Sequence, residues 1–81
     1  MFRARRKRLG QHFLTRRVAV ERVVAGIAPL PGERFLEVGP GRGALTFPLL
    51  SAGARVLAVE IDASLAKSLS RRLDGEGSFE I

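Results

Sequence analysis

Residues 35–43 read FLEVGPGRG, a short apolar run that passes directly into three glycines at alternate positions. The run predicts a buried strand, and residues 44–52 predict the helix after it. Glycines between a strand and a helix allow a sharp turn that no side chain obstructs, and we expect the N–H groups of such a turn to point outward. Glu60 ends a second apolar run, 21 residues after Gly39. An acidic residue that binds ribose hydroxyls is expected at a spacing of about 20, so the pattern predicts a nucleotide-like ligand.

Helix and strand patterns alternate along the rest of the chain. The predicted elements are a helix over 16–28, a strand over 34–38, a helix over 44–52, a strand over 55–61, a helix that begins after 62, and a strand over 78–81. Thr15 and Asp62 are the predicted N-caps of the first and last helices. Leu65, Leu69 and Leu73 then form a stripe at helical spacing. The alternation predicts an α/β fold with a parallel sheet.

Two full strands and a short third make a thin sheet for a domain of this kind. We therefore expect the 81 residues to be the N-terminal part of a longer protein. We divide the chain into a basic arm over 1–14 and the beginning of a parallel-sheet domain over 15–81.

The composition narrows the kinds of site that the chain can hold. It has no cysteine and one histidine, so we expect no metal site, and no apolar run is long enough to cross a membrane. Seven arginines and lysines and no acid lie in residues 1–17, whereas the remaining residues hold seven basic and eight acidic side chains. This uneven charge favours contact with a polyanion, with a solubilising tail as the alternative.

A carboxylate next to the glycines indicates which class of ligand the turn prefers. Glu37 would repel the pyrophosphate of a dinucleotide but would attract a cationic aminoacyl group. S-adenosylmethionine carries an ammonium and a sulfonium and no phosphate, so it fits better; a glycine turn without a ligand is the alternative. Glu60 could accept both ribose hydroxyl protons or could cap the next helix. Ile61 fits either an apolar surface for adenine or plain core packing.

Three motifs carry a resemblance to a known family. They are KRLGQHFL at 7–14, EVGPGRGALT at 37–46 and VEID at 59–62. Together they closely resemble the ribosomal RNA adenine N6,N6-dimethyltransferases, over nearly the whole chain. The resemblance implies a Rossmann-like class I methyltransferase domain that uses S-adenosylmethionine. It also implies methylation of adenine N6 in ribosomal RNA, with the small subunit favoured, by a cytoplasmic enzyme that is a monomer at full length.

The resemblance also implies roles for single residues. It places His12, Leu14, Gly39 and Glu60 against the methyl donor. The charge and glycine pattern after the first strand adds Glu37 and Gly41 to this site, and the position next to Glu60 adds Ile61. The family often has asparagine where this chain has His12. Basic residues of the arm would lie near the RNA entrance; they are Arg5, Arg6, Lys7 and Arg8. The motif that receives the target base is absent from these residues, so we expect no catalytic residue here and no activity from the 81 residues alone.

Two other classes remain open at this point. A nicotinamide-dependent oxidoreductase would share the fold and Glu60, but the glycine spacing and Glu37 speak against it. An RNA-binding assembly or transcription factor could be built on the same scaffold without any enzymatic activity.

Overall fold

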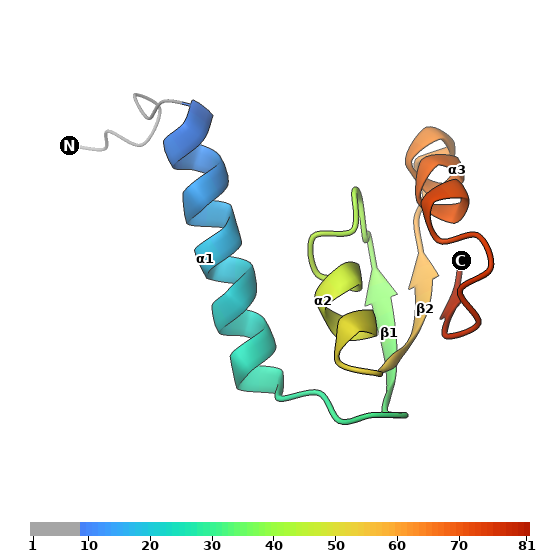
Figure 1. Cartoon of the computed structure of the whole chain (residues 1–81). Helices are drawn as coiled ribbons and strands as arrows, with labels where there is room; N and C mark the ends of the chain where they lie inside the picture. The colour runs from blue at the N-terminus through green and yellow to red at the C-terminus, as the bar shows by residue number, and fades with distance from the viewer. Residues whose placement is uncertain (1–8) are drawn as a thin grey trace.

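Three parallel strands form one sheet, and the helices alternate with them along the chain (Figure 1). The computed structural model describes the backbone of residues 9–81 and the side chains of residues 16–81. The elements are α1 (Leu9–Ile27), β1 (Arg34–Val38), α2 (Thr46–Ser51), β2 (Arg55–Val59), α3 (Ala63–Arg72) and β3 (Phe79–Glu80). The sheet order is β1-β2-β3, with Phe35 opposite Val56 and Val56 opposite Phe79. The predicted α/β fold with a parallel sheet is confirmed.

The start of the first helix was predicted wrongly. The helix α1 begins at Leu9, so the expected cap Thr15 lies inside it, and residues 9–14 are helical although they show no clean period. Once a helix is nucleated, each further residue adds a backbone hydrogen bond, and this favours extension through residues that do not oppose it. The other end agrees with the sequence: Ala28 adopts a left-handed conformation with φ +48°, and its N–H donates to the Val24 carbonyl.

The second helix is shorter than expected at its beginning. Residues 41–45 form turns, and α2 starts at Thr46 rather than at 44. The Gly43 N–H closes a turn on the Pro40 carbonyl at 2.8 Å, and the Phe47 N–H donates to the Gly43 carbonyl at 3.0 Å. Gly53, with φ +87°, follows the helical region, in agreement with the predicted end of this helix at 52.

The two faces of the sheet are covered to different degrees. Leu49 of α2 packs with Ala54, Val56 and Ala58 in a buried cluster, and Leu69 of α3 is 1% exposed. On the opposite face the alternate residues of β1 and β2 are exposed; they are Leu36, Val38, Leu57 and Val59. The covered face therefore holds the core and supports the loops at the carboxyl ends of the strands.

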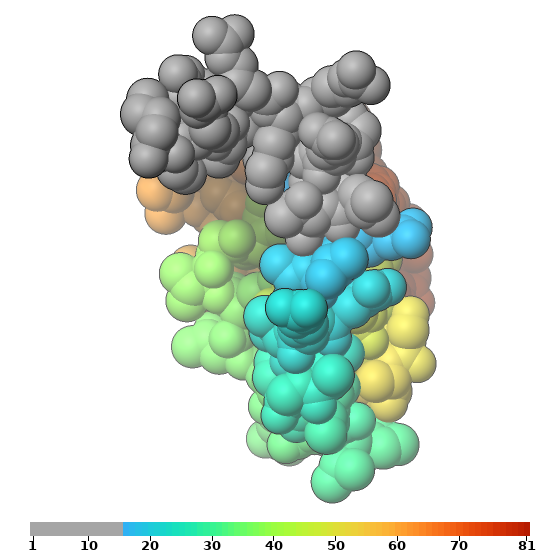
Figure 2. Space-filling view, turned by 90° about the vertical axis from the view of Figure 1, so that its left-hand side faces the viewer, coloured from blue at the N-terminus to red at the C-terminus, as the bar shows by residue number. Residues whose placement is uncertain are grey.

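The helix α1 lies against α2 on the outer side of the covered face. In the space-filling view its described part, blue to teal, lies in front of the green and yellow segments that contain the glycine turn and α2 (Figure 2). Residues of α1, of α2 and of the turn before α2 line a shared surface hollow; they are Arg16, Arg17, Val20, Glu21, Ala44 and Pro48. Among the residues that the structure describes, no helix is both long and apolar enough to cross a membrane.

Candidate functional site

The glycine turn, residues 39–45, leaves the carboxyl end of β1. Gly39, Gly41 and Gly43 have φ values of +70°, +57° and +90°, which L-residues with a Cβ rarely adopt. In open parallel sheets, ligands bind outside the carboxyl ends of the strands, which is where this turn lies. The three glycines are thus required by the backbone path of the turn itself.

All three glycine N–H groups are bonded inside the protein, so our expectation that they point outward was wrong. Gly39 donates to the Val59 carbonyl at 2.7 Å, Gly41 donates to Glu60 at 2.9 Å, and Gly43 donates to the Pro40 carbonyl at 2.8 Å. A phosphate bound at a turn of this kind takes its hydrogen bonds from free backbone N–H groups. The arrangement therefore favours a ligand without phosphate at these glycines.

Glu60 connects the two loops at this edge of the sheet. Its Oε1 accepts the Gly41 N–H at 2.9 Å and its Oε2 accepts the Asp62 N–H at 3.0 Å, so both oxygens are held by backbone donors. A carboxylate oxygen can accept more than one hydrogen bond, so each oxygen keeps acceptor capacity for a ligand hydroxyl. The alternative in which Glu60 caps α3 is excluded, because Asp62 accepts the N–H groups of Ser64 and Leu65.

Glu37 lies on the covered face, just below the glycine turn. Its half-buried carboxylate accepts a short hydrogen bond from the hydroxyl of Thr46, which is fully buried at the start of α2. Sequence analysis missed Thr46 as a partner of the site. A threonine at the start of a helix nine residues after a carboxylate was a possible signal, but only the folded turn brings the two side chains together.

Besides Glu37, the predicted site residues fall into three groups. Gly39, Gly41, Glu60 and Ile61 lie together at the carboxyl edge of the sheet, and Ile61 is 98% exposed among the described residues. The backbone of His12 and Leu14 belongs to α1, but their side chains lie outside the described residues. The arm residues also lie outside the described residues; they are Arg5, Arg6, Lys7 and Arg8.

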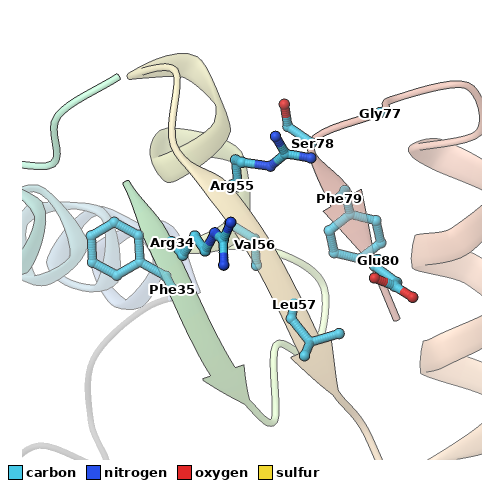
Figure 3. Close-up of a pocket in the computed structure, with 9 residues that line it drawn as sticks. All are labelled: Arg34, Phe35, Arg55, Val56, Leu57, Gly77, Ser78, Phe79 and Glu80. Atoms are coloured by element: carbon cyan, nitrogen blue, oxygen red, sulfur yellow. The ribbon is translucent and has the colours of Figure 1, made fainter. Parts of the chain in front are cut away.

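A separate hollow of about 340 Å³ opens at the amino ends of the strands, away from the glycine turn (Figure 3). Arg34 and Arg55, the first residues of β1 and β2, are paired in register, and Phe79 of β3, paired with Val56, also lines the hollow. This hollow lies at the edge of the sheet where α/β proteins do not bind their main ligands. Within the described part of the chain, no three histidine or acidic side chains gather as possible metal ligands.

The parallel sheet with alternating helices is a Rossmann-like α/β fold. The structure of PH1948 from Pyrococcus horikoshii, which is assigned as an RNA methyltransferase, matches this fold with a TM-score of 0.63 and 24% identity, over 79% of this chain and 32% of that chain. A family model described as ribosomal RNA adenine dimethylase matches residues 2–81. The chain belongs to the ribosomal RNA adenine dimethylase family.

Curated relatives agree with this family. A ribosomal RNA small subunit methyltransferase A from Thermosynechococcus vestitus is 51% identical over 76 residues, which are 94% of this chain and 28% of that protein. A protein of the same name from Methylococcus capsulatus is 43% identical over 76 residues, which are 94% of this chain and 30% of that protein. The chain thus spans less than a third of the length of these relatives.

Proposed function

We propose that this chain is the donor-binding part of an S-adenosylmethionine-dependent enzyme that dimethylates adenine N6 in ribosomal RNA, with the small subunit as its target. Family membership and the names of the relatives support the class of reaction. The observation that best supports S-adenosylmethionine as the ligand is the geometry of Glu60. This carboxylate follows the end of β2, and backbone N–H groups orient both of its oxygens.

The residues of the carboxyl edge fit the parts of this donor. Glu60 would accept ribose hydroxyl protons with its remaining acceptor capacity, and Ile61, which is 98% exposed, would offer an apolar surface to the adenine ring. Gly39 and Gly41 have no Cβ, and an added Cβ at either would meet nothing within 4 Å, so a ligand can approach their backbone closely. The glycine N–H groups are already bonded, which suits a donor that carries no phosphate.

Charge complements this assignment. Glu37 places a carboxylate beneath the turn, where it would attract the cationic aminoacyl part of the donor. The donor would supply a methyl group on a sulfonium, which leaves a neutral thioether when the methyl is transferred. These residues bind and orient the donor, and we propose that none of them moves a proton; alignment with the acceptor amine then provides most of the rate enhancement.

The proposal extends to residues whose side chains lie outside the described residues. We propose that His12 and Leu14 complete the donor site, and that Arg5, Arg6, Lys7 and Arg8 bind RNA phosphates. We further propose that the complete protein is a cytoplasmic monomer, that it methylates an unpaired adenine, and that residues 1–81 alone do not.

The proposal is tested by calorimetry and by methyl transfer with the full-length protein. We expect binding of S-adenosylmethionine and no binding of NAD, and transfer of labelled methyl groups to adenines of small-subunit ribosomal RNA. Binding of NAD in place of the methyl donor would refute the proposal in favour of an oxidoreductase. Binding of RNA with neither donor binding nor methyl transfer would indicate a non-enzymatic RNA-binding factor.

A further inference from the structure

We propose that Arg72, the last residue of α3, is a positioning residue that fixes the second half of the glycine turn in the conformation that receives the donor. The inference rests on the proposed function for the identity of the ligand. Arg72 lies 30 residues from the turn in the sequence, yet its Nη1 donates to the Arg42 carbonyl at 3.0 Å. Its guanidinium also lies over the ring of Phe47, 4.7 Å from the ring centroid.

Phe47 carries the contact onward to the last glycine of the turn. A Cβ added to Gly43 would come within 2.6 Å of the Phe47 ring and 3.1 Å of the Leu69 side chain. The Arg72 guanidinium, the Phe47 ring and the Arg42–Gly43 peptide therefore form a closed set of contacts. Leu69 and Arg72 lie three residues apart on one face of α3, so a single helix face supplies both contacts to the turn.

The two halves of the turn are held by different parts of the protein. Glu60 holds the first half through the Gly41 N–H, and α3 holds the second half through the Arg42 carbonyl and the packing at Gly43. Arg42 lies between two glycines in left-handed conformations, where the backbone has many alternatives. If Arg72 is removed, we expect the turn to populate other conformations, and the apparent donor affinity falls with the fraction that remains competent.

The chemistry of the contact requires arginine at this position. A guanidinium is planar, so it can stack on a ring and donate a directed hydrogen bond at the same time, whereas a lysine ammonium is a compact point charge. The neighbouring Arg71 provides a matched control. It is exposed, it also lies in the last turn of α3, and its side chain makes no hydrogen bond or ring contact with the turn among the described residues. Its removal changes the net charge by the same amount as removal of Arg72.

The test measures donor affinity in the full-length protein for Arg72→Ala, Arg72→Lys and Arg71→Ala. We expect Arg72→Ala to weaken binding of S-adenosylmethionine by about three- to tenfold, Arg72→Lys to recover part of the loss, and Arg71→Ala to leave the affinity unchanged. In steady-state kinetics the KM for the donor should rise while kcat at saturating donor stays within about twofold. A role in stability alone would lower the unfolding temperature without changing the affinity of the folded protein.

Hydrogen exchange of the Gly43 amide separates this inference from the proposed function. Because that N–H is bonded to the Pro40 carbonyl, a loosened turn should expose it, and Arg72→Ala should raise its exchange rate about three- to tenfold over Arg71→Ala. Equal exchange and equal donor affinity in the two alanine variants would overturn the inference. Failure of the unmutated protein to bind the donor would overturn the proposed function instead, and faster Gly43 exchange in Arg72→Ala would still support Arg72 as the residue that holds the turn.

Discussion

The two loops at the carboxyl edge of the sheet bond their backbone N–H groups in different ways. The glycine turn after β1 satisfies its backbone with left-handed glycines whose N–H groups are bonded inward. The loop after β2 has no glycine and uses two carboxylates, with Glu60 accepting from Gly41 and Asp62, and Asp62 capping α3. The conformation of the glycine turn therefore depends on its glycines and on contacts from neighbouring segments. The loop after β2 is instead held by its own side chains, Glu60 and Asp62.

This difference predicts that the glycine turn is sensitive to added bulk, and the largest effect is expected at Gly43. Gly43→Ala combines a left-handed backbone with a clash against Phe47, and should cost about 2–5 kcal/mol of unfolding free energy. Gly75→Ala is the matched control, because φ is +82° there but an added Cβ meets nothing within 4 Å. Urea unfolding checks both variants. Similar losses in the two variants would mean that packing against Phe47 contributes nothing.

The end of the glycine turn depends on one buried hydroxyl. Thr46→Val keeps the shape of the side chain but removes the donor to Glu37, and should cost about 1.5–3 kcal/mol because the partner is a carboxylate. Thr46→Ser keeps the hydroxyl and loses one methyl group, so it should cost about 1 kcal/mol. If valine proves no worse than serine in urea unfolding, the hydrogen bond to Glu37 does not stabilise the turn.

The link between the two loops is tested at Glu60. Glu60→Gln retains one amide oxygen, so the side chain can no longer accept hydrogen bonds from both Gly41 and Asp62. The affinity for S-adenosylmethionine should therefore fall about 10- to 100-fold. Glu76→Gln is the control, because that exposed carboxylate accepts the Ser78 N–H in a loop outside the site. Calorimetric titration with S-adenosylmethionine measures both variants. A Glu60 variant that binds as tightly as the control would remove this carboxylate from the donor site.

The smallest effect is expected where the second loop only begins a helix. Asp62→Ala removes the acceptor for the Ser64 and Leu65 N–H groups and should cost about 1 kcal/mol. Asp62→Ser should recover most of that stability, because serine is also a good N-cap. The measurement is the midpoint of urea unfolding at constant m-value, and a serine variant as unstable as alanine would argue that Asp62 acts through its charge rather than as a cap.

Much of the fold could be predicted because its signals are local. The strand over 34–38, the Asp62 cap, the leucine stripe of α3 and the stop at Gly53 depend on residues within a few positions of one another. The start of α1 was predicted wrongly because Thr15 is a good cap by type, and local rules do not show that a helix already begins at Leu9.

The sequence by itself determined the order of the elements, the parallel sheet, and the placement of the glycines and Glu60 at the same edge of it. Hydrophobic periodicity and turn chemistry carry that information along short stretches of chain. Tertiary structure alone decided where the glycine N–H groups go, that Thr46 holds Glu37, and that Arg72 reaches Arg42. Apart from the local bond between Gly43 and Pro40, these contacts join residues 9 to 30 positions apart, and groups so distant find their partners only when packing brings their elements together.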